Sequence, residues 1–284
     1  MLVYIRGAGD LASGIALRLH HAGFFIVMSD LPEPTAVRRT VCFSEAVRHG
    51  KCMVEDVEAV FASSSIHNTE NVTHERKCIK SRETVETIHH ILNSGRIAVV
   101  IDLDDSILHK LRPDVLVDAI VGKRNLGTAI TDAPLVIAVG PGFTAGKDCH
   151  ALIETKRGHR LGRVILEGTT LPNTGIPGNI AGYGEERVLW SARAGIFHTH
   201  KNIGDLVEAG EVVGEIDGHP EKSAISGMIR GLLPDGMKVR EHMKLGDVDP
   251  RGKEAEYLTV SDKALAVAGG VLEAICRLSD KTDN

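Results

Sequence analysis

Apolar residues near the start of the chain follow two different periods. Residues 2–5 form a short apolar run, and a second run, residues 24–28, is followed by Asp30. Between the runs, apolar residues recur every four positions, the spacing of one helix face. They are Leu11, Ile15 and Leu19. Gly23 follows as a stop for this helix. The pattern predicts a strand, a glycine turn, a helix and a strand that ends at an acid.

The glycine turn carries the residues that a dinucleotide-binding unit needs. Gly7 permits a tight turn after the strand, and Gly9 lets the backbone approach a pyrophosphate at the positive end of the helix. Ala12 stands where a third glycine is common, and Asp30 lies where an acid accepts hydrogen bonds from ribose hydroxyls. We therefore expect a Rossmann-type unit with a bound nucleotide. The alternative is an α/β turn whose glycines serve packing alone.

Three further apolar runs predict buried parallel strands. Residues 97–101 are followed by Asp102, residues 115–117 by Asp118, and residues 135–139 by a glycine-rich loop that starts at Gly140. Continuous apolar runs are typical of parallel strands, and ligands of such sheets bind beyond the carboxyl ends of the strands. These acids are candidates for chemistry, although they would equally serve as caps of helices or turns.

The loop of residues 140–148 and its basic neighbours are candidates for anion binding. The loop fails the nucleoside-triphosphatase template because Gly140 and Gly146 are one residue too far apart and Asp148 replaces a serine or threonine. Its N–H groups would still suit an anion. Residues 123–128 and 156–163 flank it with cations, which grip phosphate or form salt bridges. His150 and Glu154 are four residues apart and His159 is near, a spacing that would suit a metal ion, but fourteen histidines make chance proximity easy, so no metal site is predicted.

The C-terminal part contains an internal repeat. Residues 191–217 match residues 223–249 at a constant offset of 32, with seven of 27 positions identical. Units this small must pack on each other to bury a core. The sequence of residues 204–216 resembles that of biotinyl/lipoyl-type domains, and this resemblance implies a flattened barrel of two β halves. Lys222 lies at the joint but lacks the Met-Lys-Met setting of carrier domains, so we expect no prosthetic group. Residues 261–275 then predict a helix, with Gly269 and Gly270 as an interruption that allows close packing.

Composition narrows the function classes. The 284 residues are 43% hydrophobic and 25% charged, as in globular proteins. A formal net charge of −5 and 4% aromatic residues argue against nucleic-acid binding. The five cysteines form no C-x-x-C pair and favour a reducing compartment. The sequence shows neither a signal peptide nor an apolar run long enough to span a membrane. These features predict a cytoplasmic protein without a membrane partner.

Six segments carry a specific resemblance. They are residues 123–128, 140–146, 157–159, 161–164, 174–178 and 247–252. Together they resemble the YqeB-like family, accessory proteins of selenium-dependent molybdenum hydroxylase systems. The opening is similar to the Rossmann part of the xanthine dehydrogenase accessory factor, in which a histidine often replaces Asp10. The resemblance implies a maturation role: equipping a client hydroxylase with its cofactor, which can carry a labile selenium ligand. Among the cysteines, Cys149 is the best placed for a selenium relay, and the alternative is a small buried side chain.

The predicted architecture is α/β. It comprises a Rossmann-like parallel-sheet domain (1–175), a biotinyl/lipoyl-like barrel-sandwich domain (185–252) and a C-terminal helix (255–284) that packs back on the first domain. The predicted cofactor-binding residues lie in the glycine turns and basic loops. They are Gly7, Gly9, Asp10, Asp30, Lys123, Arg124, Asn125, Gly140, Gly142, Gly146, Arg157 and His159.

The predicted ligand is a nucleotide, NAD or similar, or a molybdenum cofactor. The predicted partners are a client molybdenum hydroxylase and a second copy of the chain. Whether the chain is an enzyme stays open, and no catalytic residue can be named. The alternative function is an NAD(P)-dependent oxidoreductase, which the lack of a His/Asp or Tyr/Lys catalytic set beside the glycine turn disfavours.

Overall fold

The computed structural model describes residues 1–62, 81–172 and 178–279. Cys78 and residues 174–177 of one resemblance segment lie outside the described residues. The chain divides into two compact units. The first unit comprises Met1–Pro34, Phe43–Pro172 and Ser261–Asn284, and the second comprises Thr35–Cys42 and Asn173–Val260.

A nine-stranded sheet forms the centre of the first unit within the described residues, in the order β3-β4-β5-β2-β1-β6-β7-β8-β9. The strands are β1 (Leu2–Arg6), β2 (Phe25–Asp30), β3 (Lys51–Val54), β4 (Val57–Phe61), β5 (Ile97–Ile101), β6 (Val115–Asp118), β7 (Leu135–Val139), β8 (Ala151–Ile153) and β9 (Val164–Ile165). The central strands β1, β6 and β7 are almost wholly buried, as their continuous apolar runs require.

The sheet is mixed, which corrects the predicted Rossmann-like parallel sheet. Neighbouring strands from β4 to β8 run parallel, but β3 pairs antiparallel with β4, and β9 pairs antiparallel with β8. The β3–β4 pair is a tight hairpin whose turn residue Glu55 has φ 53°. Long apolar runs identify buried central strands, whereas these short, partly exposed edge strands lack that signal. The α/β class holds, but the fold class was wrong in its finer form.

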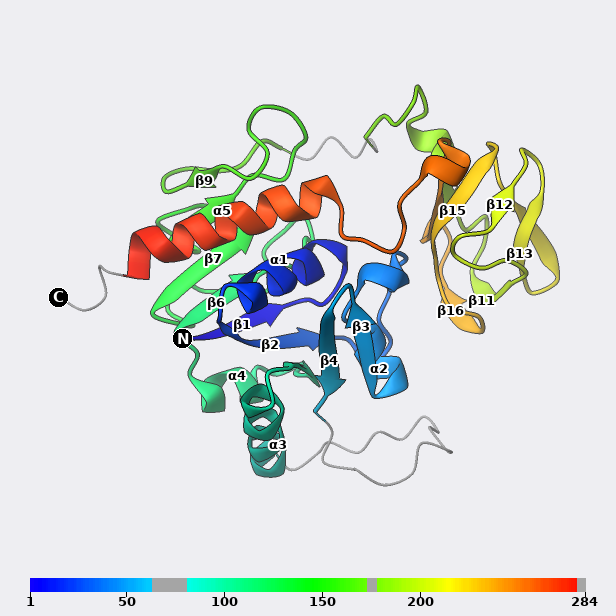
Figure 1. Ribbon diagram of the computed structural model, residues 1–284. Coiled ribbons are helices and arrows are strands. Elements are labelled where there is room, and N and C mark those ends of the chain that lie inside the picture. Colours follow the sequence, from blue (N-terminus) through cyan, green and yellow to red (C-terminus); the bar gives the residue numbers. More distant parts are fainter. Residues whose placement is uncertain (63–80, 173–177, 280–284) are drawn as a thin grey trace. The chain divides into compact units, whose positions relative to one another are not determined.

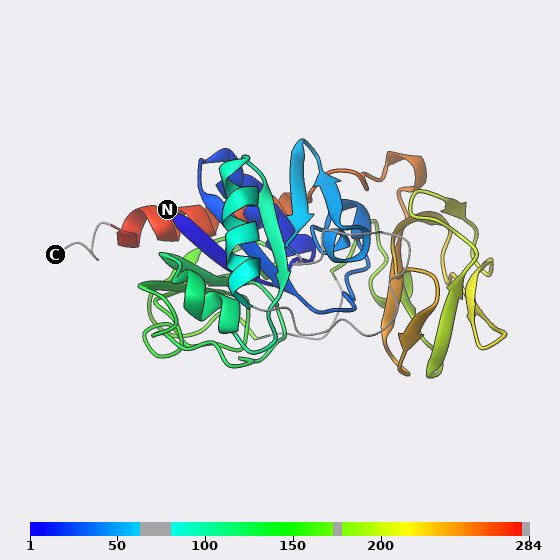
Figure 2. The ribbon, with the colours of Figure 1, turned by 90° about the horizontal axis from the view of Figure 1, so that it is seen from below.

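Helices cover both faces of this sheet. They are α1 (Asp10–His21), α2 (Glu45–His49), α3 (Ser81–Asn93), α4 (Ser106–Leu111) and α5 (Asp262–Leu278). In Figure 1, α1 and α5 lie on one face, and α3 and α4 lie on the other. Figure 2, seen from below, brings α3 to the front and leaves α5 behind the sheet. Buried side chains such as Tyr4, Ile88 and Leu116 join α3 and the strands in one core.

Helices α1 and α5 run in the same direction and touch closely. A Cβ atom on Gly14 would lie 2.7 Å from Cβ of Ala264, and a Cβ atom on Gly269 would lie 3.5 Å from the Arg18 guanidinium. The residue numbers of the contacting pairs increase together along the two helices, so the helices are parallel. Both begin near the same edge of the sheet, as Figure 1 shows. Helix α5 is continuous through Gly269 and Gly270, so the predicted interruption was wrong.

The second unit consists of two four-stranded antiparallel sheets within the described residues, β10-β17-β15-β12 and β14-β13-β11-β16. The strands are β10 (Val188–Trp190), β11 (Gly195–Thr199), β12 (Leu206–Val207), β13 (Val212–Ile216), β14 (His219–Lys222), β15 (Gly227–Leu232), β16 (Met237–Val239) and β17 (Lys244–Asp249). Three short 3-10 helices are Arg39–Val41, Glu185–Arg187 and Gly252–Glu254.

Two separate sheets replace the predicted biotinyl/lipoyl-like barrel-sandwich. The sequence offset of 32 relates β11 to β15 and β13 to β17, and each sheet takes strands from both repeats. Buried residues between the strands, among them Phe197, Ile229 and Val248, form a core of this unit's own. The repeat therefore specifies the strands. The sequence pattern of residues 204–216 did not specify how these strands are arranged in sheets.

Candidate functional site

Three loops meet at the carboxyl ends of β1, β6 and β7. A Cβ atom on Gly7, after β1, would lie 3.0 Å from the carbonyl oxygen of Ala119, after β6. A Cβ atom on Gly142, after β7, would lie 2.5 Å from Cα of Arg124. The chain leaves β1 toward β2 on one side and returns to β6 on the other, so this edge is the switch point of the sheet. Ligands of open α/β sheets bind at such points.

The turn after β1 is fixed by its own hydrogen bonds. Gly7 adopts φ 98°, and its N–H donates to the Ser29 carbonyl at 2.8 Å. The Ala8 carbonyl accepts from the Ser13 hydroxyl and from the Ser44 N–H, both at 3.0 Å. Gly9 is the N-cap of α1 and offers no side chain to the first N–H groups of that helix. The turn therefore presents backbone donors at the start of α1 in a rigid frame.

Asp30 lies against this turn, as its place at the end of β2 predicted. Its carboxylate accepts from the Leu31 N–H at 2.7 Å and from the Ala8 N–H. Burial raises the pKa of this carboxyl, while those hydrogen bonds and Arg48 lower it in part. Part of the acceptor capacity of Asp30 thus braces the glycine turn.

Arg6, the last residue of β1, is buried and forms an ionic network at the switch point. Its guanidinium pairs with Asp105 at 2.8 Å and with Asp132 at 3.2 Å, and it also donates to the Thr128 hydroxyl. The Arg6 side chain is only 9% exposed. One cation therefore joins the end of β1, the start of α4 and the loop after β6.

Asp118 extends the network below Thr128. It is 2% exposed and accepts from the Thr128 hydroxyl at 2.6 Å and from the Ile120 N–H at 3.2 Å. Burial raises the pKa of Asp118, although these hydrogen bonds and Arg6 oppose the rise. Asp102 has the capping role that was left open for these acids, because it accepts from the N–H groups of Ile107 and Leu108 at 3.1 and 2.9 Å.

The loop after β6 presents two of the predicted cations. Lys123 and Arg124 are exposed, and Val121 and Lys123 adopt φ 57° and 62°. Left-handed backbone is costly for a β-branched residue and is found where surrounding contacts enforce it. The side-chain amide of Asn125 forms its hydrogen bonds within the loop. Its oxygen accepts from the N–H groups of Gly127 and Thr128, and its NH₂ donates to the Thr128 carbonyl, all at 2.8 Å. Asn125 therefore shapes the loop.

Many N–H groups of the loop after β7 donate hydrogen bonds to acceptors of the protein itself. Thr144 donates to Asp148 at 2.7 Å, Ala145 to the Gly168 carbonyl at 2.9 Å, and Gly146 to the Cys149 carbonyl at 2.8 Å. Gly140 is buried, and its N–H donates to the Ile153 carbonyl at 2.9 Å. Of the three predicted glycines, Gly142 lies closest to the cation-bearing loop, against the backbone of Arg124, and Gly140 approaches Val121 of the same loop.

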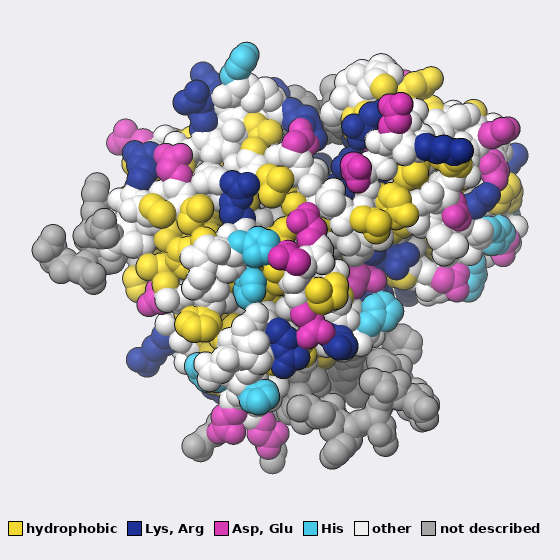
Figure 3. Space-filling view, viewed as in Figure 1, with side chains coloured by type: hydrophobic (Ala, Val, Ile, Leu, Met, Phe, Trp, Pro, Cys, Tyr) yellow, Lys and Arg dark blue, Asp and Glu magenta, His cyan; other side chains and the backbone are white. Residues whose placement is uncertain are grey.

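The second basic segment faces α5. Arg157 forms a two-pronged ion pair with Asp262, with N–O distances of 2.8 and 3.1 Å. His159 is exposed, and its carbonyl accepts from Arg163 at 3.2 Å. Arg157, which the sequence predicted to bind an anion, thus uses two of its donors for a carboxylate of α5. On the face shown in Figure 3, lysine and arginine side chains are scattered among acids.

Metal ligation finds no support among the described side chains. No group of three or more His, Cys, Asp or Glu residues there is placed to hold an ion. Glu154 is 2% exposed and accepts from the N–H groups of Thr155, Lys156 and Leu171, each at 2.8 Å. His150 accepts from the Val136 N–H at 2.9 Å.

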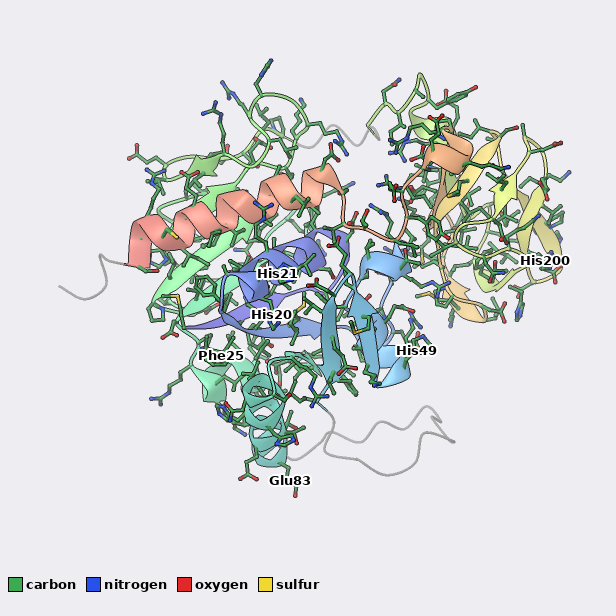
Figure 4. The ribbon with its side chains drawn as sticks, in the orientation of Figure 1. His20, His21, Phe25, His49, Glu83 and His200 are labelled. Atoms are coloured by element: carbon green, nitrogen blue, oxygen red, sulfur yellow. The ribbon has the colours of Figure 1, made fainter. Side chains whose placement is uncertain are left out.

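The histidines labelled in Figure 4 come from α1, α2 and the second unit. His20 and His21 end α1, His49 ends α2, and His200 belongs to the second unit. His21 pairs with the exposed Asp56 at 3.1 Å. The His21–Asp56 contact is a surface ion pair when the ring is protonated, and such pairs contribute little to stability.

Cys149 is wholly buried at the end of the loop after β7. Burial raises the pKa of its thiol to about 12. A thiol of this kind is not ionised near neutral pH, and the thiolate is the reactive form of cysteine. Cys149 therefore fits the small buried side chain that the sequence also allowed, and not a selenium relay.

Sequence reasoning missed two residues of this region, Arg6 and Lys263. Arg6 ends an apolar run directly before Gly7, which was the available signal. Lys263 lies in the first turn of α5 and interacts electrostatically with Asp10, the first residue of α1. No sequence pattern connects positions this far apart.

Comparison with known proteins gives one strong similarity. No family model matches the chain. The chain is 48% identical over 277 residues to the uncharacterized protein YqeB of Escherichia coli (strain K12), which covers 98% of this chain and 48% of that protein. The chain thus spans about half the length of the curated relative that it matches. The match supports a YqeB-like family for this chain.

Similarities to solved structures are weak. They include an aspartoacylase family protein from Mesorhizobium loti (12% identity, 87% of this chain and 84% of that chain, TM-score 0.27) and succinylglutamate desuccinylase/aspartoacylase from Rhodobacter sphaeroides (15%, 87% and 84%, 0.26). A third is the ectoine utilization protein EutE (DoeB) from Ruegeria pomeroyi (16%, 30% and 28%, 0.21). TM-scores this low assign neither a fold nor a function.

These neighbours differ from the classes that the sequence predicted. None of the three carries the name of a Rossmann nucleotide-binding protein or of a molybdenum hydroxylase maturation factor. What corrects the predicted Rossmann description is the strand pairing itself, which makes the sheet of this α/β protein mixed. In the described part of the chain, no helix is both long enough and apolar enough to cross a membrane.

Proposed function

We propose that the chain binds a phosphate-bearing cofactor, of the molybdopterin or nucleotide type, at the loops that follow β1, β6 and β7. The observation that carries the proposal is the direct contact between these loops, which brings the Gly7 turn, Arg124 and Gly142 to one edge of the sheet. Backbone donors at the start of α1 suit a phosphate, and so do the exposed Lys123 and Arg124. The proposal rests on these local contacts and not on fold class.

A carboxylate of the same edge constrains the rest of the ligand. Asp30 is half-buried beside the glycine turn, and a carboxylate accepts hydrogen bonds from hydroxyl or ring N–H groups. A ligand that combines phosphate with such donors matches both halves of the site. Simple inorganic anions match only the cationic half.

We further propose that the bound cofactor serves a client molybdenum hydroxylase, for which the chain acts as an accessory factor. This role is what the resemblance of the six sequence segments implies. The 48% identity to an uncharacterized protein supports the family and leaves the client to experiment.

The binding site is tested by Arg124→Ala, with Arg157→Ala as a matched control. Titration calorimetry with pyrophosphate, CTP, GTP and NAD should show binding by the unmodified protein. Arg124→Ala should weaken binding about 10- to 100-fold, the cost of a charge-assisted hydrogen bond of about 1.5–3 kcal/mol. Arg157→Ala should bind normally, because that guanidinium is already paired with Asp262. Equal affinities of Arg124→Ala and the unmodified protein would place the ligand elsewhere.

The accessory role needs its own measurement. Co-expression of a molybdenum hydroxylase with the unmodified chain should raise hydroxylase activity above that obtained with Arg124→Ala. Cofactor content of the purified hydroxylase should change in parallel. A hydroxylase that is equally active and equally loaded without the chain would refute this role and leave the binding site standing.

A further inference from the structure

Lys263 stands in the first turn of α5, beside the start of α1. Its neighbour Ala264 packs directly on Gly14 of α1, so the position of this turn is fixed relative to the glycine turn. The turn is capped by Ser261, whose hydroxyl accepts from the Ala264 N–H at 3.2 Å. Because α1 and α5 run in the same direction, Lys263 lies at the edge of the sheet where the Gly7–Gly9 turn lies.

The charged groups that act on Lys263 come from α1, from the segment after β8 and from α5 itself. Asp10 belongs to α1, Glu154 and Arg157 to the segment after β8, and Asp262 to α5 itself. No carboxylate of the described residues forms an ion pair with its ammonium group: Asp262 pairs with Arg157, and Glu154 spends its oxygens on backbone N–H groups. Lys263 is half-buried, so this cation has lost water without gaining an ion-pair partner.

The loss of water around Lys263 changes the pKa of its ammonium group. Burial is the largest cause that lowers the pKa of Lys263, and the nearby Arg157 lowers it further, while Asp10, Glu154 and Asp262 oppose the change. A desolvated ammonium gains more from an anion than a hydrated surface lysine does. The three carboxylates act on this ammonium without forming an ion pair with it, so a direct ionic contact of Lys263 would have to come from a ligand.

We propose that Lys263 contacts the phosphate of the ligand bound at the Gly7–Gly9 turn, a role that rests on the proposed function. A phosphate at this turn would lie between the start of α1 and the first turn of α5. The C-terminal helix would thereby supply the cation that the sequence had assigned to Arg157.

Pyrophosphate is the probe for the first experiment. The titration compares the unmodified protein with Lys263→Gln, Lys263→Arg and the control Lys110→Gln, whose lysine is exposed on α4. Lys263→Gln should weaken binding roughly tenfold or more, and Lys110→Gln should not change it. Lys263→Arg keeps the charge at all accessible pH values, so it should retain binding as the pH rises toward the ordinary lysine value of about 10.4, where the unmodified protein loses binding. Thermal unfolding of each variant checks that it is folded.

Amine labelling supplies a readout independent of any substitution. Mass spectrometry should show that pyrophosphate protects Lys263 of the unmodified protein from an amine-specific reagent, while Lys110 is labelled equally with and without the anion. If the unmodified protein binds pyrophosphate but Lys263→Gln binds it equally well and Lys263 is not protected, the role of Lys263 is refuted and the proposed site stands. If the unmodified protein binds neither pyrophosphate nor the cofactors, both fall.

Discussion

Single buried charges decide how the edge of the first unit behaves. Arg6 neutralises carboxylates that arrive from two loops, and Asp118 is stabilised by Thr128 rather than by a direct ion pair. Removing one member of a buried pair costs more than removing both, because the remaining charge stays desolvated. The network therefore fixes the start of α4 and the loop after β6 together. Because Lys123 and Arg124 belong to that loop, the network also positions their backbone.

The protonation of Asp118 should be visible in the pH dependence of stability. Burial raises the folded-state pKa of this carboxyl above its unfolded value, so the stability that its proton provides is present in acid and is lost as the pH rises through the folded pKa. Asp118→Asn carries no such charge and can still accept from Thr128. The free energy of unfolding of this variant, measured by urea titration, should therefore rise relative to the unmodified protein between acidic and neutral pH.

Asp104 offers a control of opposite sign. Hydrogen bonds from Ser106 lower the pKa of this exposed carboxyl, so it stabilises the folded state above its unfolded pKa and loses that effect as the pH falls. The free energy of unfolding of Asp104→Asn should fall relative to that of the unmodified protein as the pH rises. Parallel pH curves for the unmodified protein and Asp118→Asn would show that burial does not govern Asp118.

The sequence located residues of this edge where local pattern carries the information. Asp30 and Asp118 could be placed because each follows a buried strand, and strand ends converge at one edge of a parallel sheet. The use of Arg157 could not be predicted, because its partner Asp262 lies 105 residues away and only the packing of α5 brings the two together. Arg6 was overlooked because a cation at the end of an apolar run is equally typical of a solvated strand end.

At the scale of elements, the contact of α1 with α5 depends on small residues. Gly14 faces Ala264 on α5, and on another side of α5 a Cβ atom on Gly270 would lie 2.1 Å from the Gly162 carbonyl oxygen. Gly162 in turn would meet the Ala266 carbonyl at 2.4 Å. Helix α5 thus lies between α1 and the loop after β8, with little room on either side. The sequence predicted close packing at its glycine pair, but not which glycine needs it.

The two adjacent glycines of α5 should respond to alanine in opposite directions. Gly270→Ala places a methyl group against a backbone oxygen, and overpacking of this kind costs about 1–3 kcal/mol. Gly269→Ala meets only the flexible end of Arg18 at 3.5 Å and gains helix propensity, worth up to about 1 kcal/mol. Urea unfolding of the two variants measures the difference. A Gly270→Ala variant as stable as Gly269→Ala would mean that the loop after β8 yields without cost.

At the scale of the whole molecule, the chain builds its second unit from two distant segments. Residues 35–42 leave the first unit after Pro34 and belong to the second unit together with residues 173–260. The Val37 carbonyl accepts from the Leu232 N–H at 2.8 Å, and Arg39 donates to the Leu232 carbonyl at 2.8 Å. Sequence analysis placed this stretch within a domain of residues 1–175, because no repeat or periodicity marks so short a segment.

Val37 should therefore control the second unit without affecting the first. Its side chain packs on the core that contains Leu232 and Leu233, so Val37→Asp buries a carboxylate there and should cost about 2–4 kcal/mol locally. Thr35→Asp is the control, since Thr35 is exposed two residues earlier. Hydrogen exchange followed by mass spectrometry should show roughly tenfold or faster exchange of β15 and β17 in Val37→Asp, with β1 and β6 unchanged. Equal acceleration in both units would show that they unfold as one, and no acceleration in β15 would show that residues 35–42 contribute no stability to the sheet they join.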